Sequence, residues 1–153
     1  MSPEVLTNRL AELNKVLLDL SANVALPLEE QKASHYEIER QVQLAVDLSV
    51  GVARRILSLE GEEIPSSARL VFKSLVQLEI LESALAERLA LAAGLRNILV
   101  HDYQSLNEEL FFSGLEGALR CFRVFLWLLL LICLKSIQFK PVSKMGLFPD
   151  TIS

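Results

Sequence analysis

The chain has 153 residues, of which 52% are hydrophobic, and its formal net charge is -4 at pH 7. This length and apolar content are enough for one domain with a real hydrophobic core. The acidic balance excludes a protein that coats nucleic acid through a uniformly basic surface, although it leaves room for a local cationic site. With only 6 glycines and 5 prolines, the composition favours long helices over a turn-rich β architecture.

The first half of the chain predicts two helices. Residues 2–4 place a serine, a proline and a glutamate in the order that is typical of a capped helix start. Leucines then recur at steps of four and three along one face: Leu6, Leu10, Leu13, Leu17 and Leu20. A second, long helix is predicted over residues 28–59, which keep the same apolar period. Gly61, inside the polar segment 60–67, predicts the end of that helix and a linker.

The second half continues the helical pattern. The period resumes after Pro65, with a break or kink expected near residues 79–82. Ser105 and Glu108 have the S-x-x-E spacing of a capping box, so the preceding helix is expected to end around residue 103 and a new one to start at Ser105. The last helix is predicted from about Asn107 to residue 134, and residues 135–153 are expected to form an irregular tail. The sequence thus predicts an all-α, antiparallel helical bundle of four to five helices over residues 1–134.

Residues 124–134 form an uninterrupted apolar run of 11 residues. Because roughly 18–20 are needed to span a bilayer, we expect a buried helix or a subunit interface here and no membrane insertion. Trp127 within this run is interpreted as a core or dimer contact. The N-terminus lacks the basic-then-apolar order of a signal peptide. Cys121 and Cys133 have no metal-ligand spacing, so we expect buried reduced thiols, no metal site and a cytoplasmic location.

A cluster of polar residues interrupts the apolar stretch LRNILVHDYQS, residues 95–105. On a helix, Asn97 and His101 would lie within about 40° of each other, and Arg96 and Tyr103 within about 20°. The four side chains therefore cover a wide wedge of the helix surface. Such a wedge is difficult to bury in one core, because each buried polar group needs its own partner. We expect it to face a cleft or a second subunit.

The residue types in this cluster indicate phosphate chemistry. A guanidinium binds a phosphate through two hydrogen bonds, and an imidazole takes or gives a proton near neutral pH. Together they suit attack by an RNA 2′-hydroxyl on its adjacent phosphate, with His101 moving protons and Arg96 stabilising the developing charge, and without a metal or other cofactor. A lone Arg-x4-His is more often structural, whereas the added Tyr103 makes a chance match much rarer.

Other polar residues predict less. His35 is interpreted as a surface or capping residue, since it has neither ligand spacing nor a catalytic partner in the sequence. Asp102 is expected to be a solvent-facing or capping group. Arg54 and Arg55 could help to capture RNA, but a solvated helix face is the favoured interpretation.

The stretch RNILVHDY resembles the R-x4-H-x-Y motif of HepT-like toxins in the HEPN superfamily. Arg96, His101 and Tyr103 occupy the three defining positions, and Asn97 occupies the commonly polar position after the arginine. HYEIERQVQLAVDLSV and LAERLALAAGLRNILVHDY are also similar to that family, and the likeness covers roughly residues 1–120. The tail after residue 134 does not match. The resemblance implies a HEPN-like bundle that forms a homodimer, with two copies of the motif facing one cleft.

The resemblance also implies a function. The implied protein is a metal-independent endoribonuclease that cleaves RNA and acts as the toxin of a two-gene toxin–antitoxin system. Its implied catalytic residues are Arg96, His101 and Asn97. The implied partner is an MNT-type nucleotidyltransferase antitoxin that transfers AMP from ATP onto the motif tyrosine, here Tyr103. The alternative that the residues leave open is a non-catalytic helical subunit that binds nucleotide and supports a neighbouring nucleotidyltransferase.

Overall fold

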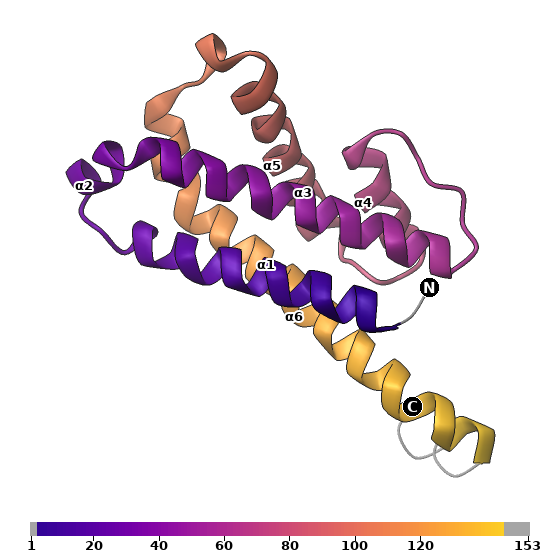
Figure 1. Cartoon of the computed structure of the whole chain (residues 1–153). Coiled ribbons are helices and arrows are strands. Elements are labelled where there is room, and N and C mark those ends of the chain that lie inside the picture. Colours follow the sequence, from indigo (N-terminus) through magenta and orange to yellow (C-terminus); the bar gives the residue numbers. More distant parts are fainter. Residues whose placement is uncertain (1–2, 146–153) are drawn as a thin grey trace.

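The structure is a computed structural model that describes the backbone of residues 3–145 and the side chains of residues 4–135. Within that part of the chain it contains six α-helices, one short 3-10 helix and no strand, as Figure 1 shows. The elements are α1 (Pro3–Val24), α2 (Leu28–Ala33), α3 (His35–Leu59), α4 (Ala68–Gln77), α5 (Ser83–His101), η1 (Tyr103–Ser105) and α6 (Glu108–Met145). The predicted all-α fold class is confirmed.

The core lies between α1, α3 and α6, with α4 and α5 forming a hairpin beside them. Helix α1 packs against both α3 and α6, α4 packs on α3, and α5 packs on α3 and α6. The predicted leucine stripe of α1 is confirmed, since all five leucines are at most 7% exposed. The rings of Phe72 and Phe125 meet edge to face with their centres 5.9 Å apart. Each such buried side chain contributes about 1.5–3 kcal/mol to folding. The apolar face of each helix therefore determines which side packs into the core.

The predicted helix over residues 28–59 is divided in two. Helix α2 ends at Ala33, and Ser34 adopts φ -104° and ψ 25°, outside the helical geometry, before α3 begins at His35. No residue of α2 is buried. Because short helices depend on tertiary packing rather than on propensity, nothing holds α2 in line with the buried α3. The expectation of one continuous helix was wrong for this reason.

Helices α3 and α4 each end in a C-terminal turn of the same hydrogen-bonded type. After α3, Gly61 lies in the left-handed region at φ 73°, with Gly61 N bonded to Ser58 O and Glu62 N to Leu57 O. This confirms the predicted stop at Gly61. After α4, Glu79 takes the equivalent position at φ 61°, with bonds back to Val76 O and from Ile80 N to Leu75 O. The expected break near residues 79–82 is confirmed, although a glutamate rather than a glycine makes the turn.

The predicted capping box at Ser105 is wrong. Helix α6 begins at Glu108, and the residue before it, Asn107, accepts a hydrogen bond from the backbone N–H of Leu110 through its side-chain oxygen at 3.1 Å. Asn107 is therefore the N-terminal cap, since asparagine is one of the preferred capping residues. Ser105 instead donates through Oγ to Asp102 Oδ2 at 2.6 Å. That bond joins the residue before η1 to the last residue of η1, and Asp102 is exposed, as expected.

Helix α6 is longer than predicted. Its backbone stays helical to Met145, so residues 135–145 are not irregular, and α6 extends beyond the other helices in Figure 1. No glycine or proline occurs between residues 118 and 140, so no residue in that range breaks the helix. The rest of the expected tail, residues 146–153, lies outside the described residues.

One face of α6 packs into the core and another stays exposed. Phe122, Phe125 and Leu129 are buried, whereas Trp127 is 66% exposed. The interpretation of Trp127 as a core residue is therefore wrong, while its interpretation as a dimer contact stays a prediction. Glu108–Lys135 is long and apolar enough to cross a membrane by length and composition alone, a test that core helices of soluble proteins also meet. The shortness of the 11-residue run thus does not by itself exclude a membrane span. Cys121 and Cys133 are half-buried free thiols, less enclosed than expected.

Candidate active site on α5 and η1

The chain divides the polar cluster between two elements. Arg96, Asn97 and His101 lie on α5, whose last residue is His101, and Tyr103 begins η1. Asp102 between them has φ -149° and ψ 54°, which leaves the helical geometry. The helix thus ends two residues earlier than expected, so the calculated angle between Arg96 and Tyr103 on one helix does not apply. Tyr103 is turned by the break toward α3.

Arg96 binds the side chain of Asp47 on α3. Its Nε donates to Asp47 Oδ1 at 2.8 Å, and its Nη2 lies 3.5 Å from Asp47 Oδ2. The Arg96 side chain is 25% exposed and that of Asp47 is 42% exposed. A pair this accessible to solvent stabilises the fold only weakly. Nη1 bonds to no residue in the described part of the chain, so one edge of the guanidinium remains able to donate to an anion.

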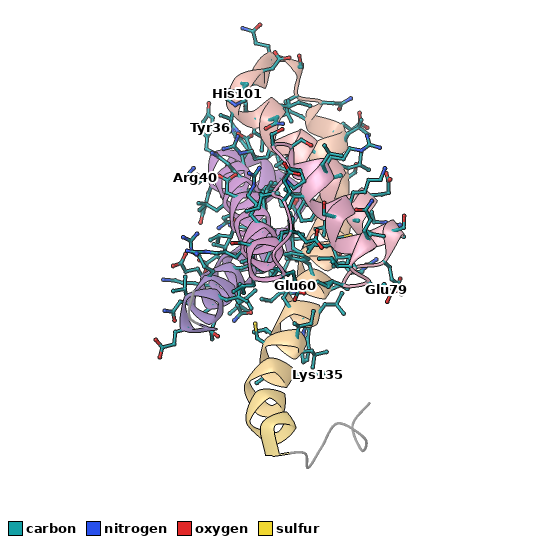
Figure 2. The ribbon with its side chains drawn as sticks, turned by 90° about the vertical axis from the view of Figure 1, so that its right-hand side faces the viewer. Tyr36, Arg40, Glu60, Glu79, His101 and Lys135 are labelled. Carbon is teal, nitrogen blue, oxygen red and sulfur yellow. The ribbon has the colours of Figure 1, made fainter. Side chains whose placement is uncertain are left out.

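His101 and Asn97 are exposed on the last turns of α5. They are four residues apart, so they share one face of the helix. Neither side chain has a hydrogen-bond partner among the described side chains. Figure 2 shows His101 toward the same end of the molecule as Tyr36 and Arg40, with Lys135 toward the other end. The imidazole of His101 is thus open to a ligand or to another chain.

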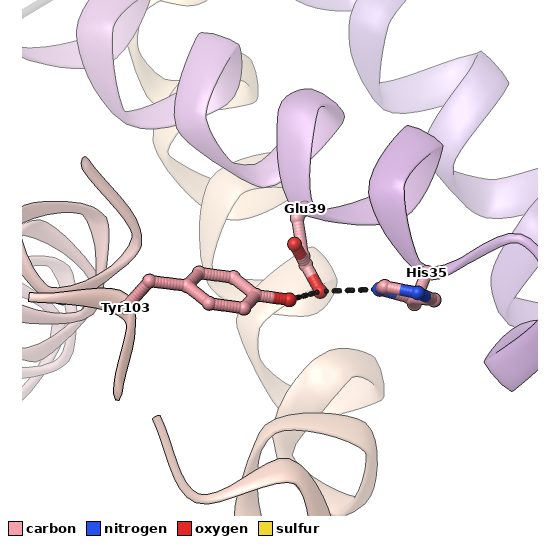
Figure 3. A network of polar contacts seen from close by, with 3 residues as sticks. All are labelled: His35, Glu39 and Tyr103. Atoms are coloured by element: carbon pink, nitrogen blue, oxygen red, sulfur yellow. Dashed lines mark hydrogen bonds and ion pairs between the residues drawn. The ribbon is translucent and has the colours of Figure 1, made fainter. Parts of the chain in front are cut away.

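Tyr103 reaches back to α3 and forms a three-residue network. Its hydroxyl donates to Glu39 Oε2 at 2.8 Å, and His35 Nδ1 lies 3.0 Å from the same oxygen. Figure 3 shows the Glu39 carboxylate between the phenol and the imidazole. With its proton on Nδ1, the imidazole donates to Glu39. The interpretation of His35 as a surface or capping residue without a partner was therefore wrong.

Burial and charge in this network act on the phenol. Partial desolvation raises the pKa of Tyr103 from 10.0 to about 12, and the hydrogen bond to Glu39 together with the negative charge of that carboxylate adds to the effect. Tyr103 as a residue is nevertheless 41% exposed. Tyr103 is therefore a partly exposed residue whose phenol is a neutral hydrogen-bond donor at neutral pH.

One protomer brings together only parts of the predicted site. Arg96 turns to Asp47, Tyr103 turns to Glu39, and His101 and Asn97 face solvent. No hydrogen bond links Arg96 to His101 within the described residues. Arg54 donates to the carbonyl oxygen of Ser66 at 3.0 Å, which fastens the linker after α3. No group of three or more His, Cys, Asp or Glu side chains among the described residues is arranged to hold a metal ion.

Sequence reasoning missed two carboxylates, Glu39 and Asp47. Glu39 is only 8% exposed and lies on the same helical face as the buried Val42 and Val46, at steps of three and four. An acidic residue in an otherwise apolar stripe was the signal that could have identified it, because a charge is rarely buried without a partner. Asp47 gave no comparable signal, since it lies on the exposed side of α3 and only the packing of α5 gives it a partner.

Known proteins that resemble this chain agree with the fold and with the family resemblance. The family model described as Ribonuclease HepT-like matches residues 6–127. The mRNA nuclease HepT of Shewanella oneidensis is 32% identical over 85 residues, which make up 56% of this chain and 64% of that relative. The alignment thus spans a little less than two thirds of the relative's length.

Several solved structures with the same fold come from toxin–antitoxin complexes. A tri-AMPylated Shewanella oneidensis HEPN toxin in complex with MNT antitoxin matches with a TM-score of 0.70 and 23% identity, over 84% of this chain and 98% of that chain. A toxin–antitoxin structure with AMP-PNP matches with a TM-score of 0.68 and 23% identity, over 84% and 98% of the two chains. At such identities the likeness concerns the fold alone. Since the family model matches most of its length, the chain belongs to the HepT-like family and has the HEPN fold.

Proposed function

We propose that this chain is the ribonuclease toxin of a cytoplasmic toxin–antitoxin pair, that it cleaves RNA as a homodimer without a metal ion, and that AMP transfer onto Tyr103 neutralises it. One observation carries the proposal: α5 bears both His101 and Arg96. The imidazole of His101 is exposed at the end of the helix, and the guanidinium of Arg96, about one and a half turns earlier, keeps one edge available for a phosphate. Membership of a family whose curated relative is named an mRNA nuclease supports it.

The chemistry follows from these two groups. His101, which is exposed, would take the proton from an RNA 2′-hydroxyl as that oxygen attacks the adjacent phosphorus, and would return a proton to the leaving 5′-oxygen. The open edge of Arg96 would donate to the phosphate oxygens as negative charge builds up on them. Asn97, on the same face as His101, would donate a further hydrogen bond to the RNA. The expected products are 2′,3′-cyclic phosphate ends.

The homodimer supplies what one protomer lacks. Arg96 and His101 are five residues apart on α5, which turns them about 140° away from each other. A phosphodiester that contacts both is reached more easily when each protomer contributes a different group across a two-fold axis. Such a groove also explains how a chain of net charge -4 could capture RNA, because the cationic groups need to gather only at that axis.

Tyr103 would serve as the regulatory position. Tyr103 is partly exposed, and the AMP-bearing HEPN toxin with its MNT antitoxin has the same fold. A nucleotide attached there would place a phosphate beside the motif, where it would compete with the RNA backbone for Arg96. The proposed partner is accordingly a small nucleotidyltransferase.

Inducible expression of the chain without a partner tests the proposal. We expect growth to stop with the wild type and to continue with Arg96→Ala or His101→Ala, while Arg88→Ala, an exposed arginine elsewhere on α5, should remain toxic. Co-expression with the cognate nucleotidyltransferase should relieve the arrest for the wild type but not for Tyr103→Phe. Equal toxicity of the His101→Ala and Arg88→Ala proteins at equal abundance would favour the non-catalytic subunit instead.

A further inference from the structure

The His35–Glu39–Tyr103 network gathers two hydrogen-bond donors on one carboxylate oxygen. Glu39 Oε2 receives two donors, the Tyr103 hydroxyl at 2.8 Å and His35 Nδ1 at 3.0 Å. The three side chains connect the start of α3 to η1 (Figure 3). Tyr103 as a whole is 41% exposed, so the network does not enclose this residue completely.

Burial of Glu39 is costly for the fold. The residue is 8% exposed and lies on the buried face of α3. A well-packed apolar side chain at such a position is often as stabilising as a buried ion pair or more so, because the carboxylate must give up its water. Stability alone therefore gives little reason for a carboxylate at this position.

AMP transfer onto Tyr103 would need a base that removes the proton of the phenol. A tyrosine hydroxyl with a pKa of about 12 is protonated at neutral pH and is a weak nucleophile. It becomes effective when a base within hydrogen-bond reach, about 2.6–3.2 Å, removes the proton during attack. Among the described residues, Glu39 is the one group hydrogen-bonded to this hydroxyl.

We propose that Glu39 is the proton acceptor for AMP transfer onto Tyr103 and that His35 is the positioning residue that holds the carboxylate toward the phenol. This inference rests on the proposed function, because it takes Tyr103 as the acceptor of AMP. It means that the toxin chain supplies the base for its own modification, while the partner nucleotidyltransferase supplies the bound ATP.

The step balances without an oxidant or reductant. The Tyr103 oxygen forms a bond to the α-phosphorus of ATP as its hydroxyl proton passes to Glu39 Oε2. The bond between the α-phosphorus and the oxygen that bridges to the β-phosphate breaks, and pyrophosphate leaves with that electron pair. Glu39 is then neutral, which avoids placing a carboxylate against the new phosphodiester. Exchange with water restores the carboxylate later.

The direct test is the rate of AMP transfer to the full-length chain by its cognate nucleotidyltransferase with radiolabelled ATP. Glu39→Gln keeps the shape and one acceptor for the phenol but cannot take up the proton. We expect its kcat for transfer to fall about 100-fold, the usual weight of a general base, with little change in the KM for the toxin chain or for ATP. Glu108→Gln is the matched control, since Glu108 also places negative charge near Tyr103 without bonding to it.

His35 is tested by two substitutions. His35→Ala removes the donor to the carboxylate and should lower kcat, though less than Glu39→Gln does. His35→Asn, which keeps a donor close to the position of Nδ1, should restore most of the rate. A purely structural role of His35 would lower the melting temperature of both variants without this rescue of kcat.

The possible failures are distinguishable. If the wild type carries no label, or if Tyr103→Phe is labelled like the wild type, the proposed function of Tyr103 fails. If the wild type is labelled at Tyr103 and folded Glu39→Gln is labelled at the same rate, the proton-acceptor role is overturned while the proposed function stands. Should Glu39→Gln fail to fold by circular dichroism, Glu39→Asp replaces it. A partial loss of kcat then supports the role and a wild-type kcat overturns it.

Discussion

Asp47 holds the guanidinium of Arg96 where α3 meets α5, with Arg96 Nε donating to Asp47 Oδ1 at 2.8 Å. The motif arginine is thus partly neutralised within its own protomer. An RNA phosphate that approaches Arg96 shares it with this carboxylate, which weakens the attraction. In the isolated protomer, Arg96 is therefore expected to attract a phosphate less strongly than a free guanidinium would.

Asp47→Asn should therefore bind RNA more tightly. Removal of the carboxylate charge leaves Arg96 uncompensated, and we expect a two- to fivefold lower Kd for a short RNA at low salt, about 0.5–1 kcal/mol. The binding should be measured by fluorescence anisotropy with a labelled RNA and catalytically inactive His101→Ala as the background. Asp19→Asn, an exposed aspartate on α1, changes the net charge equally and is the control. Equal affinities of the two variants would show that Asp47 does not restrain Arg96.

The phenol of Tyr103 should ionise at unusually high pH. The chain has two tyrosines, so ultraviolet titration of Tyr36→Phe isolates Tyr103, and we expect a midpoint at about 12 rather than 10.0. Adding Glu39→Gln should move the midpoint down, because it removes the negative charge and the carboxylate acceptor. A midpoint that is the same with and without Glu39 would mean that the hydrogen bond has no influence on the phenol.

This shift also predicts a dependence of stability on pH. The folded-state pKa lies above the unfolded value of 10.0, so the folded chain holds the proton more tightly and the free energy of unfolding decreases as pH rises from about 10 to 12. Below pH 10 both states are protonated and the contribution is complete. Urea unfolding at several alkaline pH values should show a steeper decrease for the wild type than for Tyr103→Phe. Parallel curves would argue against the raised pKa.

Glu79→Gly should stabilise the fold. Glu79 ends α4 at φ 61°, a left-handed conformation that costs a non-glycine residue about 1–2 kcal/mol. Glycine avoids this strain but loses more backbone entropy on folding, so the expected gain in the free energy of unfolding is about 0.5–1 kcal/mol. Glu63→Gly in the linker, where φ is not positive, should give no gain. Chemical denaturation of both variants distinguishes relief of strain from loss of a surface charge.

A composite site between protomers predicts complementation. Arg96→Ala and His101→Ala are each expected to be inactive as homodimers. Co-expressed with different affinity tags and purified through both, they should form a mixed dimer in which one site combines an intact Arg96 with an intact His101 from the other protomer. Such a dimer should regain RNA cleavage. A mixed dimer without activity would mean that both groups act from the same protomer.

The sequence alone was sufficient for features that depend on local pattern. The leucine stripe of α1 follows from the apolar period and the stop at Gly61 from turn chemistry, both of which neighbouring residues determine. The break near Glu79 was expected although no glycine or proline enforces it. The motif on α5 could be recognised because its spacing is rare. These elements needed no knowledge of what packs against them.

The features that sequence reasoning missed depend on which partner each side chain or helix finds in the folded chain. The break at Ser34 arises because α2 finds no partner in the core, and the choice of Asn107 over Ser105 as a cap arises because Asp102 already holds the Ser105 hydroxyl. Asp47 and Glu39 acquire their roles only when α5 and η1 pack against α3. Periodicity describes which face of a helix is buried, but it does not say which side chain on another helix will meet it.

Cleavage of a defined RNA by the purified chain in the presence of EDTA is the most direct measurement. With His101 as the acid and base and Arg96 as the phosphate ligand, the wild type and Arg88→Ala should yield fragments with 2′,3′-cyclic phosphate ends, and His101→Ala should yield none. Fragments of the same kind and amount from His101→Ala, or no cleavage of any RNA by the unmodified wild type, would contradict the assignment of ribonuclease chemistry to this motif.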